Sequence, residues 1–128
     1  MDAPFGIRGL GTDLVEIERF RLALQRRAGL GTRLFTDDER AYAHEQHDPV
    51  PSLAARFGAK EAVMKALGTG LGAFTFREVE VVRDESGAPA VVLRGSAAML
   101  AEQRGVHAWQ LSLTHTDTTA MAVVLALG

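Results

Sequence analysis

The sequence predicts an α+β fold in which a largely antiparallel sheet packs against helices that cover one face. Two observations predict it. Pairs of short segments with strand periodicity are separated by turn sequences, and strands joined by short hairpins run antiparallel. Segments with helical start and stop signals lie before and between these pairs, a clustering typical of α+β folds rather than of alternating units. A length of 128 residues indicates a single domain over 1–128.

The first half of the chain is expected to hold one strand and three helices. Gly9 and Gly11 interrupt the strand and would let other backbone or a ligand come close to it. Thr36 and the glutamate three residues later form a capping-box pattern, which opens a helix that ends before two prolines. Ser52 is expected to cap the next helix and Gly68 to stop it. The expected elements are a strand over 5–14 and helices over 15–28, 36–47 and 53–67.

The second half is expected to hold two hairpins on either side of a short helix. Valines alternate with charged residues in the first of its strands, and the turn over 84–87 leads into the return strand. Ser96 is expected to cap the helix, and Gly105 to stop it. A turn over 117–119 joins the last two strands. The expected elements are strands over 77–83, 90–94, 109–114 and 120–127 and a helix over 96–104.

Composition and charge exclude several classes of protein. The net charge of -2 argues against a general nucleic-acid binder, which carries a clear basic excess. The chain has no cysteine, so disulfides, thiol nucleophiles and thiolate metal sites are excluded. No apolar run approaches the ~20 residues of a membrane span, and the first residues do not have the pattern of a signal peptide. We therefore expect a cytoplasmic protein that binds neither nucleic acid nor membrane.

Two segments far apart in the sequence carry the candidate chemistry. Asp13 ends the glycine-rich segment 9–13, and Glu61 lies in the segment 57–70, which ends in a glycine-rich loop. Two carboxylates with few other strong ligands suit Mg²⁺, which takes its remaining ligands from water and from substrate phosphates. The open loop would let a phosphate approach backbone N–H groups. Both features suit a ligand that carries phosphate.

The helix expected over 53–67 places functional side chains beside a buried face. At 100° per residue its large apolar residues form one stripe, with Glu61 at the edge of the stripe and Lys65 one turn further on. An ordinary Glu–Lys pair on a solvated face, worth only ~0.2–0.5 kcal/mol, is the competing interpretation. The helix has almost no solvated face for such a pair. Lys60 falls on the stripe, and we expect its stem to lie on the core with the ammonium group in water.

Three motifs together resemble the signatures of a known family. The first covers 9–13 and precedes a helix that bears Arg19, the second covers 56–70, and the third covers 112–115. In one-letter code they read GLGTD, RFGAKEAVMKALGTG and SLTH. In order and separation they resemble the 4′-phosphopantetheinyl transferases, and most closely the short bacterial form, the holo-acyl-carrier-protein synthase family. Gly58 departs from the family pattern, which has alanine at that position.

The resemblance implies a fold, a reaction and a set of site residues. The reaction moves 4′-phosphopantetheine from coenzyme A to a serine of apo acyl carrier protein, in fatty-acid or polyketide biosynthesis, and leaves adenosine 3′,5′-bisphosphate. Asp13 and Glu61 would bind Mg²⁺. They form the catalytic set together with Lys65, which would neutralise the departing phosphate. The residues implied to contact coenzyme A are Arg56, Lys65, Gly68, Thr69, Gly70 and His115.

Some roles have a second interpretation. His115 is also explained as a strand-end histidine satisfied by neighbouring hydroxyls, and Arg56 as a member of a surface ion pair. The proton of the attacking serine has two candidate acceptors, a carboxylate and a metal-held water. His44 and His47 stand three apart, a spacing that can hold a metal, but a solvated helix end is the preferred interpretation.

Basic residues on and after the first helix indicate an acidic partner. They are Arg19, Arg21, Arg26, Arg27 and Arg33, and the expected docking residues are Arg19, Arg26, Arg27 and Arg33. Carrier proteins of the kind that the resemblance implies are acidic, and opposite charge steers partners together; a merely solvated helix face is the alternative. The resemblance also implies a homotrimer whose active sites are shared between neighbouring subunits.

Two other functions compete with the transferase. One is a silent module that binds coenzyme A or a carrier protein, and the other is a trimeric structural protein. The silent module would not need the pair of metal ligands. The structural protein leaves Glu61 and the glycine-rich loop unexplained.

Overall fold

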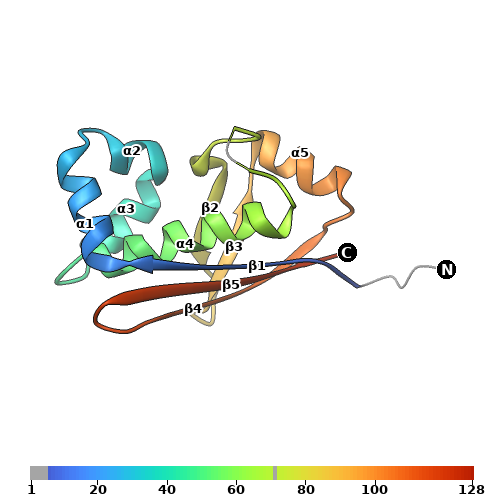
Figure 1. Ribbon diagram of the computed structural model, residues 1–128. Helices are drawn as coiled ribbons and strands as arrows, with labels where there is room; N and C mark the ends of the chain where they lie inside the picture. Colours follow the sequence, from blue (N-terminus) through green and yellow to red (C-terminus); the bar gives the residue numbers. More distant parts are fainter. Residues whose placement is uncertain (1–5, 71) are drawn as a thin grey trace.

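The computed structural model describes residues 6–70 and 72–128 and has the expected α+β architecture (Figure 1). Phe5, where the first strand was expected to begin, and Leu71 in the glycine-rich loop lie outside the described residues. The strands are β1 (Ile7–Glu16), β2 (Val79–Arg83), β3 (Pro89–Leu93), β4 (Ala108–His115) and β5 (Thr119–Leu127). The helices are α1 (Ile17–Arg26), α2 (Leu30–Leu34), α3 (Asp37–His44), α4 (Val50–Ala66) and α5 (Gly95–Gln103), with a 3₁₀ turn, η1 (Phe76–Glu78).

The strands form two antiparallel sheets. One is three-stranded, in the order β1-β5-β4, and the other is the β2-β3 hairpin. The C-terminal strand β5 lies in the middle of the larger sheet, so both β1 and β4 pair with it along their length. In this register Asp13 is opposite Ala122 and His115 is opposite Ala120. The two residues therefore lie on opposite edges of one sheet.

Helix α4 lies along the larger sheet, with α1, α2 and α3 near one end and α5 near the other (Figure 1). Glycines in β1 permit this close contact. A Cβ atom at Gly9 would lie 1.9 Å from the carbonyl oxygen of Ala66, and one at Gly11 would lie 1.8 Å from that of Ala62. Only glycine fits at such distances, so the expected close approach of other backbone is confirmed, and that backbone is α4.

Several helix boundaries differ from those expected. Helix α4 begins at Val50 rather than at position 53, because Pro51 is tolerated in a first helical turn, where backbone N–H groups have no partner in the helix. Ser52 is therefore inside the helix and does not cap it. Ser96 does not cap α5 either, because α5 begins one residue earlier, at Gly95; its N–H donates to Glu78 Oε2 at 2.6 Å. The capping box at Thr36 is present as expected.

Lys60 corrects an expectation about the core. Its side chain is fully buried, and its ammonium group lies in the protein rather than in water. Nζ donates to Glu39 Oε1 at 2.8 Å and to the carbonyl oxygens of Phe76, at 3.0 Å, and Val79. Three acceptors match the three protons of an ammonium group. The buried pair thus ties α3, α4 and the start of β2 together.

No helix in the described part of the chain is long and apolar enough to cross a membrane.

Candidate active site

Strand β1 and helix α4 bring Asp13 and Glu61 to the same hollow, which has a volume of about 740 Å³. We call it the carboxylate hollow. Its apolar lining includes three phenylalanines. The ring of Phe57 stacks on that of Phe20, with centroids 5.0 Å apart, and on that of Phe76, with centroids 5.6 Å apart. The sequence prediction that these two carboxylates share a site therefore agrees with the fold.

Lys65 belongs to the same cluster. Its Nζ donates to Asp13 Oδ1 at 3.1 Å and to the carbonyl oxygen of Thr12 at 2.9 Å. Within the described residues its ion pair is with Asp13 on β1, not with Glu61 one turn away on the same helix. The interpretation as an ordinary Glu–Lys pair on one helix is therefore wrong. The ammonium group instead bridges the strand to the helix.

Electrostatics at Glu61 favour a cation. Burial raises the pKa of Glu61, the charge of Asp13 raises it further, and Lys65 lowers it. Two carboxylates that repel one another in a half-buried hollow are stabilised by a positive charge between them. Oxygen donors are what Mg²⁺ prefers, so the donor set fits this ion. Among the described residues no group of three metal-binding side chains occurs, so water and substrate would have to complete the coordination.

Three of the four arginines expected to dock a partner line this hollow. Arg19, Arg27 and Arg33 are among its lining residues. Arg26 ends α1 and is exposed, but the described lining does not include it. Arg21, also on α1, is held by Asp48 through two hydrogen bonds of 2.7 and 3.0 Å. The carboxylates therefore lie below a basic rim.

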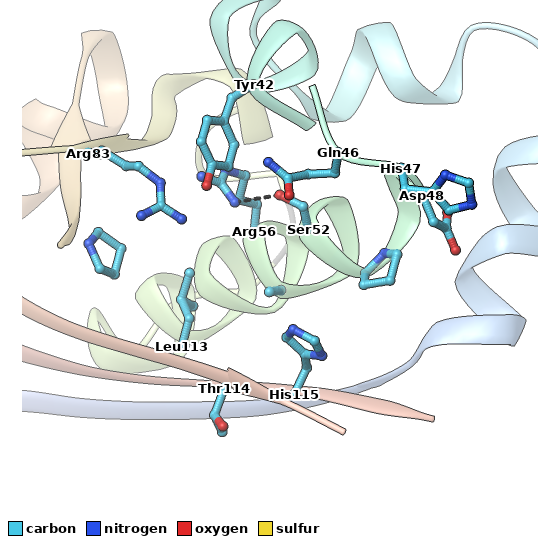
Figure 2. A pocket seen from close by; sticks show the side chains of 13 residues that line it. Tyr42, Gln46, His47, Asp48, Ser52, Arg56, Arg83, Leu113, Thr114 and His115 are labelled. Carbon is cyan, nitrogen blue, oxygen red and sulfur yellow. Dashed lines mark hydrogen bonds between the residues drawn. The ribbon is translucent and has the colours of Figure 1, made fainter. Parts of the chain in front are cut away.

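A second hollow, of about 470 Å³, contains two of the other predicted contacts (Figure 2). It lies among α3, the first turns of α4, the tip of the β2-β3 hairpin and the end of β4. We call it the tyrosine hollow, after Tyr42. Arg56 and His115, which sequence reasoning selected, both line it. Arg83, at the end of β2, lines it as well and was not predicted.

Arg56 is buried, with 4% of its surface exposed. Its Nη1 donates to Ser52 Oγ at 2.7 Å, and its Nε has no hydrogen-bond partner among the described residues. In the described part of the chain it forms no ion pair, so the interpretation as a surface ion pair is wrong. Burial lowers the pKa of Arg56. An unpaired buried guanidinium facing a hollow is typical of an anion site.

His115 is exposed at the end of β4. Its Nδ1 lies 3.2 Å from the carbonyl oxygen of Thr116, and the described contacts of the ring include no neighbouring hydroxyl. The interpretation that threonine hydroxyls satisfy it therefore finds no support. The residue lines the tyrosine hollow, and the described hydrogen bonds of its ring do not involve Nε2.

Comparison with known proteins identifies the family. The family model for the 4′-phosphopantetheinyl transferase superfamily matches residues 9–124. The chain belongs to this superfamily. It is 40% identical over 119 residues to the holo-[acyl-carrier-protein] synthase of Caldanaerobacter subterraneus subsp. tengcongensis. These aligned residues make up 93% of this chain and 94% of the relative.

Solved structures of such synthases share the fold of this phosphopantetheinyl transferase. The Neisseria meningitidis holo-[acyl-carrier-protein] synthase superposes with a TM-score of 0.84 at 34% identity, over 94% of this chain and 98% of the other. The Bacillus anthracis synthase, crystallised in complex with coenzyme A (3′,5′-ADP), gives a TM-score of 0.79 at 30% identity, over 95% and 97%. The expected α+β transferase fold is confirmed.

The glycine-rich loop of this phosphopantetheinyl transferase lies apart from both hollows. Gly68, Thr69 and Gly70 follow the C-terminal end of α4, and in the described residues neither hollow is lined by them. Gly68 has a φ of 67°, and the N–H of Thr69 donates to the carbonyl oxygen of Met64 at 3.0 Å. These contacts end the helix. The predicted phosphate contacts of the loop remain a prediction.

Sequence reasoning on this phosphopantetheinyl transferase missed Tyr42 and Arg83. Each is the kind of residue that a motif would not reveal, because Tyr42 lies on a polar helix and Arg83 precedes a hairpin turn. Only the packing of α3 against α4 and the hairpin brings them beside Arg56. His47 also lines the tyrosine hollow, but His44 and His47 belong to no group of three metal-binding side chains in the described chain.

Proposed function

We propose that this chain is a holo-acyl-carrier-protein synthase that acts in the cytoplasm. It transfers 4′-phosphopantetheine from coenzyme A to a serine hydroxyl of apo acyl carrier protein and releases adenosine 3′,5′-bisphosphate. The observation that carries the proposal is the convergence of Asp13 and Glu61 on one hollow that arginines also line, with the ammonium group of Lys65 bonded to Asp13. The family and the names of its relatives agree with it.

The carboxylate hollow would perform the transfer. Asp13 and Glu61 would hold Mg²⁺, which when bound supplies the charge neutralisation that phosphoryl transfer requires. Lys65, whose ammonium group is hydrogen-bonded to Asp13, would stabilise the negative charge on the phosphate that departs with the nucleotide. The serine oxygen would form a bond to the β-phosphorus as the bond from that phosphorus to the bridging oxygen breaks. The bridging oxygen leaves with the nucleotide, and the serine proton would pass to one of the two candidate acceptors, a carboxylate or a metal-held water. The carrier would dock on the rim formed by Arg19, Arg27 and Arg33, with Arg26 beside it.

The tyrosine hollow would hold the nucleotide end of coenzyme A. Arg56 and His115 are the proposed phosphate contacts, and Ser52 adds a hydroxyl. The two hollows lie beside opposite edges of the larger sheet, since Asp13 is on β1 and His115 on β4. A site shared between subunits would bring the carboxylate hollow of one chain to the tyrosine hollow of its neighbour. This arrangement supports a homotrimer of the kind that the family resemblance implies.

The outer face of the larger sheet supports such an assembly. Leu10 and Leu14 on β1 are 62% and 67% exposed. The cross-strand register places them opposite Leu125 and Met121 of β5, which are only half-buried. An apolar sheet face exposed on a single chain is typical of an interface. Three copies of this face would bury one another.

Intact-mass spectrometry tests the reaction. Apo acyl carrier protein is incubated with the protein, coenzyme A and Mg²⁺, and a parallel sample contains EDTA. We expect the carrier to gain one phosphopantetheine mass in the first sample and none in the second. If no gain occurs with several carriers while the folded protein still binds coenzyme A, the protein is a silent binding module instead.

A further inference from the structure

The ring of Tyr42 is in contact with two guanidinium groups. The Cζ atoms of Arg56 and Arg83 lie 4.4 and 4.6 Å from the ring centroid (Figure 2). The three side chains come from α3, α4 and β2. Both distances are well within the range of cation–π attraction. The tyrosine therefore joins two like charges that belong to different elements.

These two charges converge on the tyrosine hollow without a carboxylate partner. In the described part of the chain neither Arg56 nor Arg83 forms an ion pair, although Arg83 Nη1 donates to the carbonyl oxygen of Gly87 at 2.6 Å. Asp48 also lines the hollow, but Arg21 holds it. The repulsion between the two guanidiniums is therefore opposed by the Tyr42 ring and by the charge of Glu39, which acts on Arg56 without an ion pair. An anion placed between them would remove it.

The aromatic ring also orders the two side chains. A guanidinium that stacks on a ring loses part of its rotational freedom before any ligand arrives, so less is lost when a ligand binds. Arg83 is exposed, and without the ring only its hydrogen bond to the carbonyl oxygen of Gly87 would restrain its long side chain. The ring thus holds the two guanidinium groups in a fixed arrangement beside the Ser52 hydroxyl.

The ligand that suits this arrangement is a phosphate monoester. Such a group carries nearly two negative charges at neutral pH and offers three acceptor oxygens. Coenzyme A has one phosphate monoester, on its ribose, and a diphosphate that the proposed function assigns to the carboxylate hollow. Dephospho-coenzyme A lacks only the monoester. The pair of arginines therefore predicts discrimination between these two ligands.

We propose that Tyr42 is a positioning residue that holds Arg56 and Arg83 together as the phosphate-monoester site and thereby gives the protein its preference for coenzyme A over dephospho-coenzyme A. This inference rests on the proposed function, because that function places the nucleotide in the tyrosine hollow. It goes further by naming the residue that arranges the phosphate contacts. Tyr42 need not touch the phosphate itself.

Titration calorimetry with coenzyme A and dephospho-coenzyme A tests the proposal on the intact protein. The unsubstituted protein should bind coenzyme A at least about tenfold more tightly, since two charged hydrogen-bonding groups meet the monoester. Tyr42→Leu should weaken coenzyme A about fivefold to tenfold and change dephospho-coenzyme A less than about twofold. Tyr42→Phe keeps the ring and serves as the matched control, with both affinities within about twofold of the unsubstituted protein.

Arg83→Gln keeps the test decisive if Tyr42→Leu does not fold. Arg83 is exposed, so its replacement leaves the core intact, and it should weaken coenzyme A but not dephospho-coenzyme A. Combining it with Tyr42→Leu should add little, because both changes disable the same site. A thermal melt of each variant verifies the fold.

Each outcome has one meaning. If the unsubstituted protein does not discriminate the two ligands, the placement of the nucleotide in the tyrosine hollow is wrong. If it discriminates but Tyr42→Leu discriminates equally well, the role of Tyr42 is overturned while the proposed function stands. If Tyr42→Leu weakens both ligands equally, the ring has a structural or base-stacking role instead, and the proposal is again overturned.

Discussion

Glu61 is the residue at which stability and function oppose each other. Burial and the charge of Asp13 raise its pKa, so its carboxylate is less stable in the fold than in water. A group whose pKa is higher in the folded than in the unfolded state makes the protein less stable as pH rises through that range. A bound cation reverses this penalty. The raised pKa of Glu61 is therefore in line with the proposal that this carboxylate holds a cation.

Glu61→Gln should strongly reduce transfer and leave the fold intact. We expect a loss of about 100-fold to 1,000-fold in kcat/KM, the scale seen when one group that stabilises transition-state charge is removed. In EDTA at neutral pH the variant should melt at or above the temperature of the unsubstituted protein, because a destabilising charge is gone. It should also lose the fall in stability with rising pH that Glu61 causes. Transfer assays and thermal melts across pH measure both effects.

The matched control for this change is Glu45→Gln. Glu45 follows α3, is exposed and lies outside both hollows as far as their described lining goes, so the same loss of charge there should change neither transfer nor melting. Near-normal transfer by Glu61→Gln, with Mg²⁺ present, would contradict the assignment of Glu61 as a metal ligand.

Single residues divide into those that a motif reveals and those that it does not. Asp13 and Glu61 were predictable because each stands in a recognisable segment. Helical periodicity correctly placed Lys60 on the buried face of its helix. It could not predict that Glu39, on another helix, would accept a hydrogen bond from the ammonium group there. A buried charge is stable only with such a partner, and the partner comes from tertiary packing.

At the scale of elements, the contact between β1 and α4 builds the carboxylate hollow. Gly9 and Gly11 let the strand lie against the carbonyl groups of the helix, and this approach places Asp13 beside Lys65. Gly58, where the family pattern has alanine, is different. A Cβ there would meet Val15 Cγ2 at 3.4 Å, Ala122 Cβ at 3.6 Å and Asp13 Oδ2 at 3.9 Å, which are ordinary contacts.

Replacement by alanine should therefore have opposite effects on stability at Gly11 and at Gly58. Gly11→Ala forces the helix away from the strand, and we expect a loss of about 1–3 kcal/mol or more in the free energy of unfolding. Gly58→Ala replaces a glycine inside a helix and should gain up to about 1 kcal/mol. Urea unfolding at one fixed protein concentration measures both. Similar effects of the two changes would contradict the packing of β1 on α4.

Element boundaries were predictable where local signals act alone. The capping box starts α3 as expected, because both of its hydrogen bonds are local. Helix α2 was missed, since its 5 residues are too short for a periodic pattern. The start of α4 was misplaced because proline stops one helix and also suits the first turn of the next.

At the scale of the whole molecule, the order of the strands decides how the site can be assembled. The order β1-β5-β4 puts the two hollows beside opposite edges of one sheet. Hairpins predict that strands are antiparallel, but they do not predict that β1 pairs with the C-terminal strand. The sequence therefore indicated most of the proposed site residues. It did not indicate that they are divided between two hollows.

The exposed sheet face predicts a specific dependence of activity on assembly. Leu10→Glu places a charge on that face and should convert the protein to monomers in sedimentation equilibrium, with a loss of transfer although Asp13, Glu61 and Lys65 are unchanged. Met99→Glu is the matched control, because Met99 on α5 is also 62% exposed but lies outside the sheet. It should leave assembly and transfer unchanged. A monomeric unsubstituted protein that is fully active would rule out the shared site.

Mixed subunits test whether one active site uses two chains. Asp13→Asn disables the carboxylate hollow, and the double change Arg83→Gln/His115→Ala disables the tyrosine hollow with two exposed residues. Each variant alone should be inactive at limiting coenzyme A. Co-expressed in equal amounts, they should recover about a quarter of the normal activity, because half of each kind of hollow is intact and the two halves meet at random around a closed ring. Recovery requires that an intact carboxylate hollow on one chain work with an intact tyrosine hollow on its neighbour. If each chain used only its own two hollows, every site in the mixture would carry one defect and no activity would return.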